Sequence, residues 1–496
     1  MPLPESVAAV DLGSHSFHLL VARPSAGELV VLDRLREQVQ LAAGLNRARR
    51  LGREAQQIAL ACLRRFGQRL QHMPHEVVRA VGTNTLRTAK NARDFLKEAE
   101  EALGHPIETI SGREEARLIY LGVAHSLANP ASRRLVLDIG GGSTEVIIGE
   151  AFEPRQMESL YLGCVTVSRK YFEDGVITRE AWRRAELAAL QEFEPLQRRF
   201  RRLGWDQAVG ASGTVRSVAT VALEEGWTQN GITLKSLKRL RDAILQAGHV
   251  DKLRLAGLSP DRRPVFPGGA VLLHAAFEAL GIESMQPADG ALREGLLYDL
   301  LGRIETEDVR SRSVAALADR FHADRKQVKR VKDAAGRCLK QVAGAWHLTS
   351  DTAVRMLGWA AQLHEIGLDI AHQQYHKHGE YIVANSDLFG FTLQEQQVLA
   401  TLVRAHRRKL PADLIRELPH QWVRPTERLA VLLRLAVILN RSRSPNPLPD
   451  LAIEAEKRTL RVKFAVQWLD QHPLTRTDLE QEKEWLAAAD YSLEFS

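Results

Sequence analysis

Cysteine is scarce in this chain of 496 residues, which contains only Cys62, Cys164 and Cys338. An odd, scattered set without paired spacing argues against a disulfide framework and against a thiolate metal site. Zinc-finger spacing and an RNA-recognition aromatic motif are missing as well. These absences indicate a reducing compartment, so we expect a cytoplasmic protein, and we expect no nucleic-acid partner.

Long apolar runs are also absent. No segment reaches the ~20 apolar residues that span a bilayer, and the first residues show no cationic leader followed by an apolar core. No Gly-Lys-Ser/Thr sequence follows a glycine-rich turn, and no helix is expected directly after Gly140. The sequence therefore predicts no transmembrane segment, no Walker loop and no dinucleotide fingerprint.

Positive charge is in excess, with a net charge of +7 and a pI of about 9.3. This balance favours a polyanionic ligand or partner without naming one. Hydrophobic residues at 45% and charged residues at 26% are typical of a globular protein. A chain of this length predicts three or four domains rather than a single core.

The most informative pattern is an apolar strand that runs into an acidic, glycine-rich turn and out into a second strand. It occurs at residues 8–21 and again at residues 135–148. One constant offset relates the two copies and gives the pairs Asp11–Asp138, Leu12–Ile139, Gly13–Gly140 and Ser16–Ser143. Two copies in register predict a duplicated domain whose turns face each other across a cleft; two unrelated polar hairpins are the alternative.

The residue types in these turns suit phosphate. Glycine lets backbone amides approach an anion closely, and consecutive amides form a concave anion site. A carboxylate at the end of each strand would repel phosphate unless Mg²⁺ stood between them, partly through its waters. The candidate phosphate-binding residues are Asp11, Gly13, Ser14, Ser16, Gly140, Gly141, Gly142, Ser143 and Thr144.

Strand and helix patterns alternate over the first 303 residues, which predicts α/β layers. Residues 304–445 follow an almost entirely helical pattern, and a proline-rich segment then precedes a short tail. We expect four domains: two related α/β domains at 1–130 and 131–303, an all-α domain at 304–445 and a small α+β domain at 446–496.

Glu115 is the candidate general base. Ser111 is a plausible N-cap for the helix that carries it, and Glu115 shares an apolar stripe with Leu118 and Ile119. A carboxylate on an apolar face is costly unless function or a partner keeps it there. From the residues alone, helix capping and catalysis remain equally open for Glu115, whereas Glu114 points about 100° away and is expected to be a solvated or ion-paired surface acid.

Three further features are weaker. Arg87 follows a predicted strand at 77–81 and could reach phosphate, or form a surface salt bridge. Ser212 and Gly213 lie in a strand-to-helix turn that could hold an anion. The histidines of the helical region, among them His364 and His406, are expected to be structural or surface residues rather than metal ligands.

Taken together, the chain resembles the exopolyphosphatase/guanosine pentaphosphate phosphatase family of the actin and sugar-kinase superfamily. The resemblance rests on a set of motifs in order along nearly the whole chain: residues 10–18, 82–87, 111–119, 138–145, 210–214, 289–295 and 363–367. It implies two duplicated actin- or ribonuclease H-like α/β domains with an interdomain cleft. His15 departs from the family, which usually has Asn at this position.

The resemblance also implies roles for residues. Glu115 would be the catalytic base, Arg87 would face the ligand, and Asp138 and Glu145 would lie near the metal. The implied cofactor is Mg²⁺, with K⁺ as a candidate activator, and a homodimer is expected. The helical region is similar to an HD-type phosphohydrolase domain in which the His-Asp pair is replaced by His364-Glu365, so independent metal hydrolysis is not expected there.

The expected function is an exopolyphosphatase that hydrolyses terminal phosphate from inorganic polyphosphate processively. The alternative within the same enzyme class is a 5′-phosphohydrolase that converts pppGpp to ppGpp, and one protein could do both. Two other classes stay open: an ATP-driven kinase or chaperone on the same core, and a catalytically silent sensor of polyphosphate or guanosine polyphosphates.

Overall fold

A computed structural model describes residues 4–25, 28–46, 48–127, 132–305, 309–444 and 448–496. The chain divides into two compact units, Met1–Glu307 and Asp308–Ser496, each with its own hydrophobic core. The predicted domain boundaries at 130–131 and 445–446 lie outside the described residues, so the division into four domains stays a prediction.

The first unit contains two sheets. The first sheet has five strands in the order β3-β2-β1-β4-β5. Its central strand β1 is buried along nearly all its length, as a continuous apolar run predicts. The strand bounds are β1 Val7–Leu12, β2 Ser16–Ser25, β3 Glu28–Gln38, β4 Val78–Gly82 and β5 Ile107–Thr109.

The second sheet has six strands in the order β10-β11-β9-β6-β7-β8. The strand bounds are β6 Arg133–Ile139, β7 Thr144–Glu150, β8 Glu153–Leu160, β9 Gln207–Gly210, β10 Ile232–Thr233 and β11 Ser284–Pro287.

The two sheets repeat one arrangement. Strand β1 pairs antiparallel with β2 and parallel with β4, while β6 pairs antiparallel with β7 and parallel with β9. Asp11 lies opposite His18, and Asp138 lies opposite Glu145 at the same position of the second hairpin. The two copies of the sequence pattern therefore form equivalent hairpins in equivalent sheets.

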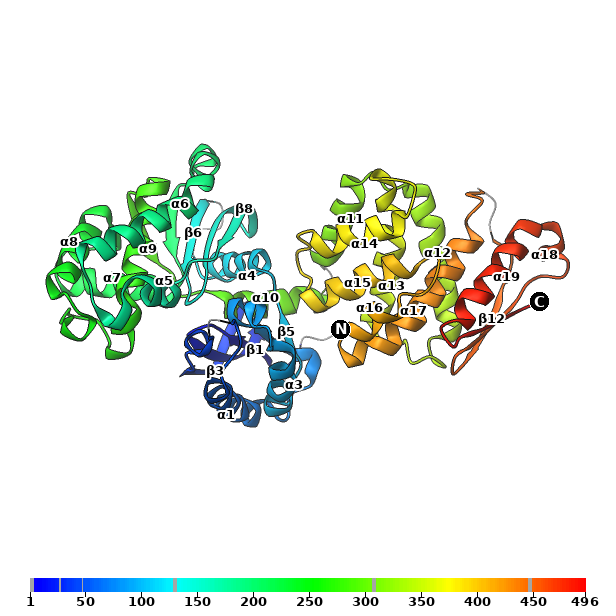
Figure 1. The fold of residues 1–496 in the computed structure, drawn as a ribbon, viewed down its shortest axis with the longest axis horizontal. Helices are drawn as coiled ribbons and strands as arrows, with labels where there is room; N and C mark the ends of the chain where they lie inside the picture. The colour runs from blue at the N-terminus through cyan, green and yellow to red at the C-terminus, as the bar shows by residue number, and fades with distance from the viewer. Residues whose placement is uncertain (1–3, 26–27, 47, 128–131, 306–308, 445–447) are drawn as a thin grey trace. The chain divides into compact units, whose positions relative to one another are not determined.

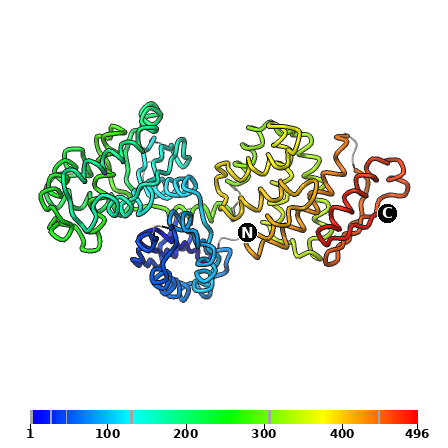
Figure 2. Tube along the Cα trace, viewed as in Figure 1, coloured from blue at the N-terminus to red at the C-terminus, as the bar shows by residue number. Residues whose placement is uncertain are grey.

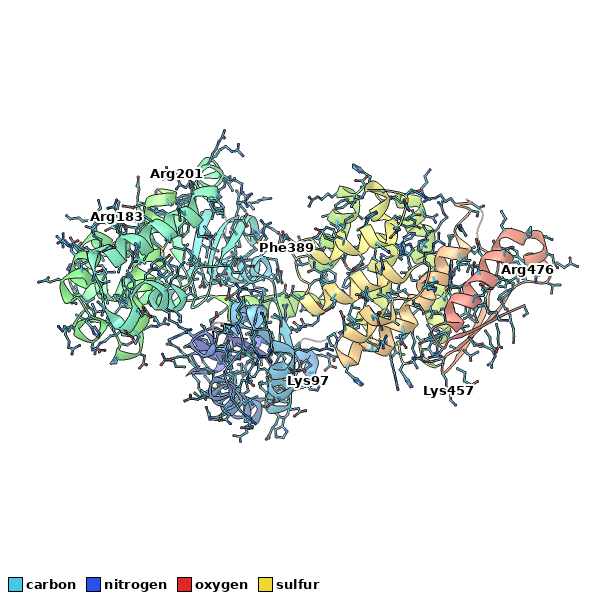
Figure 3. The ribbon with its side chains drawn as sticks, in the orientation of Figure 1. Lys97, Arg183, Arg201, Phe389, Lys457 and Arg476 are labelled. Carbon is cyan, nitrogen blue, oxygen red and sulfur yellow. The ribbon has the colours of Figure 1, made fainter. Side chains whose placement is uncertain are left out.

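Helices cover the sheets, and the outer helix α6 packs through an apolar stripe, whereas α9 is buried on nearly all sides. In α6 the stripe recurs every three or four residues and ends at Phe193 and Phe200, both fully buried. Figure 3 shows Arg183 and Arg201 of this helix at the outer surface. The helix bounds are α1 Arg53–Leu70, α2 Asn84–Thr88, α3 Ala92–Leu103, α4 Gly112–His125, α5 Cys164–Tyr171, α6 Arg179–Leu203, α7 Gly213–Glu224, α8 Leu234–Ala247, α9 Phe266–Leu280 and α10 Leu292–Glu305, with single 3₁₀ turns at Leu41–Gly44, His75–Val77, Glu173–Gly175, Val250–Lys252 and Pro260–Val265.

Two helices join the halves of the first unit (Figure 1). Helix α4 follows the first sheet in the chain but packs on β7 and β8 of the second sheet. Helix α10 follows the second sheet but packs on β1, β2 and β4 of the first sheet. The two helices also pack on each other, so the halves exchange helices instead of being built from consecutive chain segments.

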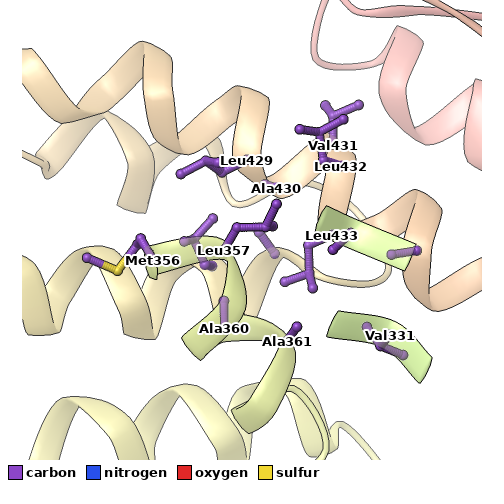
Figure 4. Close-up of a cluster of buried hydrophobic side chains, with 14 of the residues drawn as sticks. Val331, Met356, Leu357, Ala360, Ala361, Leu429, Ala430, Val431, Leu432 and Leu433 are labelled. Atoms are coloured by element: carbon purple, nitrogen blue, oxygen red, sulfur yellow. The ribbon is translucent and has the colours of Figure 1, made fainter. Parts of the chain in front are cut away.

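The second unit is helical, as expected, and ends in a small sheet of order β12-β13-β14. Figure 2 shows its red C-terminal segment beside the orange α17, and α19 packs on α17. Figure 4 shows part of its core, where Leu357 of α13, Leu433 of α17 and Val331 of α12 meet. The bounds are α11 Val309–Arg320, α12 Arg325–Val342, α13 Asp351–Leu363, a 3₁₀ turn at Ile366–Asp369, α14 Tyr375–Asn385, α15 Leu393–Ala405, α16 Ala412–Glu417, α17 His420–Leu439, β12 Ala452–Glu456, β13 Thr459–Lys463, α18 Trp468–Gln471, α19 Pro473–Ala487 and β14 Ser492–Phe495.

The structure agrees with the expected fold class, which is mixed α/β sheets followed by a helical region. Over the described residues, no helix is both long and apolar enough to span a membrane.

Candidate active site

The two glycine-rich turns meet in the first unit. A Cβ atom placed on Gly141 would lie 3.1 Å from the Cβ of Ser14 and 3.4 Å from that of His15. A Cβ atom placed on Gly142 would lie 2.6 Å from the Oδ1 of Asn84. The turn of one hairpin thus lies directly against the turn of the other, as the duplicated pattern predicts.

One pocket opens at this meeting point. It is lined by twelve of the predicted site residues, namely Asp11, Gly13, Ser14, Ser16, Glu115, Asp138, Gly140, Gly141, Gly142, Ser143, Ser212 and Gly213. The pocket therefore brings both turns, the candidate base and the third strand-to-helix turn together around one volume. Which of these residues contact a ligand remains a prediction.

Small residues are required at two places, one in the first turn and one at the start of α5, which lies against the second turn. A side chain on Gly13 would lie 2.8 Å from the carbonyl oxygen of Ser16 and would close the turn. A side chain on Gly163 would overlap the backbone of Gly141 and Gly142. Close backbone approach is the reason for glycine here, since neither residue has a positive φ.

Three carboxylates lie at the turns: Glu145 is buried, and Asp11 and Asp138 are half-buried in the pocket lining. The pKa of Asp11 and the pKa of Asp138 are both raised to about 7, mainly by burial. Repulsion by the Glu115 carboxylate raises both pKa values further. Burial, followed by repulsion from Glu115 and Asp138, also raises the pKa of Glu145 well above its ordinary value. These acids need a positive partner to be ionised together near neutral pH.

The same carboxylates fit a magnesium ion in chemistry. Their donor atoms are all oxygens, which Mg²⁺ prefers, and the Oδ1 atom of Asp11 is buried without a hydrogen-bond partner. Among the described residues these acids do not form a set of three whose oxygens all lie within 4.8 Å of one another. An ion held here would therefore keep part of its water or bind phosphate oxygens, as Mg²⁺ usually does.

Glu115 lies in the first turn of α4 and is 7% exposed. Ser111 caps the helix, because its side chain accepts a hydrogen bond from the backbone nitrogen of Glu114 at 3.1 Å. An Nη1 atom of Arg87 donates to the Oε2 atom of Glu115 at 2.7 Å and to the carbonyl oxygen of Ile110 at 2.9 Å. Capping is thus performed by Ser111, and the Glu115 side chain is directed to the pocket and to Arg87.

The surface position expected for Glu114 is wrong, although the expected ion pairing is correct. Glu114 is 1% exposed and accepts two hydrogen bonds of 2.8 Å from Arg117. Arg117 and Arg79 also contact the buried Asp299 of α10, and Arg303 donates to Asp299 at 2.9 Å. Helix α4 is buried on both sides, by the second sheet and by α10, so no face of its first turn is left for a surface acid.

Three predicted site residues lie outside the pocket lining. The Thr144 hydroxyl donates to the carbonyl oxygen of Leu162 at 2.6 Å, and Glu145 accepts a hydrogen bond from Ser159 at 2.8 Å. Arg87 is held by Glu115, while its Nη2 atom is buried without a hydrogen-bond partner. These three stand one layer behind the residues that face the pocket.

Three arginines of the pocket wall were not singled out from the sequence. They are Arg216 of α7, Arg262 and Arg293. Burial first, and then the neighbouring Arg293, lowers the pKa of Arg216, and burial also lowers the pKa of Arg262. Crowded, half-buried cations of this kind favour an anionic ligand. Arg293 lies within the motif at 289–295, which was the available signal.

Two histidines complete the wall. The Nδ1 atom of His18 lies 2.6 Å from Arg293, and burial followed by Arg293 lowers the pKa of His18. Burial, followed by Arg262 and Arg36, lowers the pKa of His15 to about 4. Both rings are therefore neutral at neutral pH, and the positive charge at the pocket comes from arginine.

The turn at Ser212 ends β9 and begins α7. Ser212 caps this helix by accepting from the backbone nitrogen of Val215 at 3.2 Å. The buried hydroxyl of Thr214 donates to the carbonyl oxygen of Ile139 at 2.9 Å and ties this turn to the second glycine-rich turn. The third anion turn predicted from sequence thus lies in the same pocket.

In the second unit, His364 and His406 are buried, and their Nδ1 atoms contact the carbonyl oxygens of Ala361 and Val403 at 2.8 and 2.6 Å. Glu365 instead pairs with Arg443 at 2.6 Å. Within the described part of this unit, no three His, Cys, Asp or Glu side chains bring their ligand atoms within 4.8 Å of one another. The Nε2 atoms of both histidines are buried without a hydrogen-bond partner, so the structural role expected for them stays a prediction.

Comparison with known proteins supplies the family. Residues 20–304 match the Ppx/GppA phosphatase family, and residues 309–483 match domain III of Ppx/GppA phosphatases. A protein of Vibrio cholerae serotype O1 named guanosine-5'-triphosphate,3'-diphosphate pyrophosphatase is 41% identical over 478 residues, which cover 96% of this chain and 95% of that protein.

Solved structures support the fold. The Ppx/GppA family member of Aquifex aeolicus has a TM-score of 0.52 at 26% identity and covers 60% of this chain and 98% of its own. An exopolyphosphatase from Cytophaga hutchinsonii has a TM-score of 0.54 at 23% identity, with 60% and 98% covered, and supports the fold alone. Matches to both parts of the chain, together with a relative that spans nearly all of it, establish that this chain belongs to the Ppx/GppA phosphatase family.

Proposed function

We propose that this enzyme removes the terminal 5′-phosphate of pppGpp, which yields ppGpp and inorganic phosphate. Family membership makes the chain a phosphoanhydride hydrolase, as expected from the sequence. The observation that carries the proposal is the single pocket in which both glycine-rich turns, Glu115 and three arginines come together. The relative that covers 96% of the chain bears the name of this activity and not that of an exopolyphosphatase.

The proposed chemistry uses the chain's own groups in order. Backbone amides of the turns at 13–16 and 140–143 would donate to the oxygens of the terminal phosphoryl group. Glu115 would accept a proton from the attacking water, while Arg87 holds its carboxylate in place. The water oxygen would form a new bond to the terminal phosphorus as the bond from that phosphorus to the bridging oxygen breaks. ppGpp would depart with the bridging oxygen.

Magnesium completes this proposal. Asp11, Asp138 and Glu145 would hold Mg²⁺, which when bound neutralises charge on the phosphate oxygens. K⁺ stimulation and a homodimer stay predictions on the strength of the family resemblance.

The arginine wall favours a substrate with anionic groups beyond the terminal phosphate. Arg216, Arg262 and Arg293 line the pocket without belonging to either glycine-rich turn. pppGpp carries a diphosphate at its 3′ position in addition to its 5′-triphosphate, so it offers such a second anionic group. Inorganic polyphosphate also carries further charge, and it remains the second candidate because the same turns would accept any terminal phosphoanhydride.

The decisive experiment compares phosphate release from pppGpp and from long polyphosphate by one preparation in Mg²⁺ buffer. We expect kcat/KM to be higher for pppGpp by roughly tenfold or more. A preference for polyphosphate would reject the substrate proposed here and restore the exopolyphosphatase hypothesis. Tight binding of either compound without phosphate release would instead indicate a sensor. Release of ADP from ATP in the presence of a sugar acceptor would indicate a kinase.

Substitutions of two neighbouring arginines test whether the arginines of the pocket wall bind the substrate. Arg262→Gln should raise KM for pppGpp roughly tenfold, because a cation that lines the pocket is lost. Arg263→Gln removes the same charge from a residue that does not line the pocket and should leave KM unchanged. Equal effects of the two substitutions would remove Arg262 from substrate recognition.

A further inference from the structure

A second cluster of ligand-type side chains lies away from the phosphate pocket, where α6 packs on α9 (Figure 1). It consists of Glu186 on α6 with His274 and Glu278 on α9. One ligand atom from each side chain lies within 4.8 Å of the others, and among the described residues no other three His, Cys, Asp or Glu side chains meet in this way. None of the three lines the pocket described above.

The spacing of these residues explains why they converge. His274 and Glu278 are four residues apart, so they lie one above the other on the same face of α9. Glu186 reaches them from the facing helix. The cluster therefore joins two helices that are distant in the chain, since α6 ends at Leu203 and α9 begins at Phe266.

His274 is the residue that points to a ligand. It is 2% exposed, and neither of its ring nitrogens makes a hydrogen bond of acceptable geometry. Its Nδ1 atom nevertheless lies 2.9 Å from the Oε1 atom of Glu186. A buried imidazole left without a hydrogen bond is unfavourable, so the fold must supply this ring with another partner.

A close nitrogen-oxygen approach without hydrogen-bond geometry is the arrangement of two ligands on one ion. Zinc binds imidazole nitrogen and carboxylate oxygen at about 2.0–2.2 Å, so neighbouring ligand atoms in its tetrahedral shell lie about 3.4 Å apart, and a small side-chain shift from the present 2.9 Å would reach that spacing. The indole nitrogen of Trp182 donates to the Glu186 carboxylate at 3.4 Å and helps to orient it.

We propose that Glu186, His274 and Glu278 form a structural site for a divalent transition-metal ion of the zinc type, which joins α6 to α9. One imidazole nitrogen and two carboxylates suit Zn²⁺, whereas Mg²⁺ prefers an all-oxygen shell. Glu278 is exposed, so the ion can enter from solvent. Water would complete the shell, as three protein ligands leave a position open.

The position of this site on α9 links it to the helices that support the second glycine-rich turn. At the start of α9 the backbone nitrogen of Gly268 donates to Ser168 of α5 at 3.1 Å, and a side chain on Gly269 would overlap Thr214 of α7. Helix α9 thus supports the helices behind the second glycine-rich turn. An ion between α6 and α9 stabilises this support and takes no part in the reaction.

The test uses the full-length enzyme in phosphate-free buffer with saturating Mg²⁺, which occupies oxygen sites at the phosphate pocket. Equilibrium dialysis against micromolar Zn²⁺ should show one bound zinc per chain that Mg²⁺ does not displace. Zinc at about a hundredfold above its Kd should raise Tm by roughly 5 °C. Cobalt in place of zinc should give visible absorption with the intensity of a four- or five-coordinate ion.

The matched variants are Glu278→Gln and Glu283→Gln, which remove the same charge from exposed positions. Glu278→Gln should weaken zinc binding by roughly ten- to a hundredfold and abolish the rise in Tm, with phosphate release unchanged. Glu283→Gln should bind zinc like the unmodified enzyme. No bound zinc, or equal binding by Glu278→Gln and the unmodified enzyme, would overturn the proposal and leave an ordinary contact between His274 and Glu186.

Discussion

Glu115 is the residue on which the proposed chemistry depends most directly. It faces the pocket, and Arg87 holds one of its oxygens at 2.7 Å. Glu115→Gln keeps the shape but cannot accept a proton, so we expect kcat to fall on the order of a hundredfold or more. Phosphate release under saturating substrate measures this. Glu101→Gln, on the exposed face of α3, is the control, and near-normal kcat in Glu115→Gln would assign the base elsewhere.

The buried acids make stability depend on pH and on magnesium. The folded, metal-free protein raises the pKa of Asp11 and of Asp138 from 3.8 to about 7. Between these pH values the folded chain holds protons that the unfolded chain has released, so its stability falls as pH rises from about 4 to about 7. Magnesium must displace these protons, and its binding strengthens over the same range.

We therefore expect Mg²⁺ to raise Tm by several degrees more at pH 8 than at pH 6. Thermal unfolding at both pH values, with and without the ion, measures the difference. The double variant Asp11→Asn with Asp138→Asn should lose the pH dependence of the Mg²⁺ effect. An Mg²⁺ effect that is the same at both pH values in the unmodified protein would show that these two acids do not hold the ion.

At the scale of elements, the crossing of α4 and α10 positions Glu115. The helices approach so closely that a Cβ atom on Gly295 would overlap the carbonyl oxygen of Leu118, and one on Gly122 would overlap that of Ala291. Gly295→Ala should therefore push α4 away, lower the free energy of unfolding by roughly 1–3 kcal/mol and reduce kcat as well.

Gly336→Ala is the control for this substitution. Gly336 lies in α12, and a Cβ atom there would meet nothing within 4 Å. This change should leave kcat unaltered and should stabilise the helix by up to about 1 kcal/mol, because alanine has the higher helix propensity. Denaturant unfolding and kcat are measured for both variants. An unchanged kcat in Gly295→Ala would show that the crossing does not position the base.

The same crossing contains a buried ion network. Asp299 of α10 contacts Arg79 and Arg117, and these contacts hold the pKa of Asp299 well below its ordinary value. A depressed pKa means that this stabilisation is present above pH 3.8 and is lost as pH falls below it.

Asp299→Asn leaves two arginines buried beside a neutral group. We expect a loss of roughly 3–5 kcal/mol, measured by denaturant unfolding at pH 7. The difference from the unmodified protein should shrink as pH is lowered below 3.8, because the unfolded unmodified chain then takes up a proton that the folded chain excludes. A loss under about 1 kcal/mol would mean that water replaces the carboxylate and that the network is not desolvated.

At the scale of the whole chain, the two units have separate cores, so we expect two unfolding transitions. Leu433 is fully buried in the core of the second unit (Figure 4). Leu433→Ala should lower the stability of that unit by roughly 2–5 kcal/mol. Calorimetry is carried out with and without a non-hydrolysable substrate analogue in Mg²⁺. The ligand should raise the transition temperature of the first unit and leave that of the second unit unchanged. One cooperative transition shifted by both changes would contradict this independence.

Local sequence determined several parts of this protein. Apolar strands that end in Asp-x-Gly turns specify the two hairpins, because close backbone approach within the turn admits only a small residue at Gly13. Ser111 followed by Glu114 and Glu115 specifies the start of α4. These features depend on neighbours within a few residues, and so the pattern alone predicted them, together with the α/β layers. The enzyme class was predicted from the family resemblance.

Contacts between distant segments could not be predicted from the sequence. Only the tertiary structure decided that α4 crosses to the second sheet, that Glu114 is buried with Arg117 and Asp299, and that Arg216, Arg262 and Arg293 meet at one wall. Charge runs look alike whether their side chains end in solvent or in a pocket. Burial, which decides the difference, is set by packing partners that are far away in the chain, as His18 and Arg293 are at a separation of 275 residues.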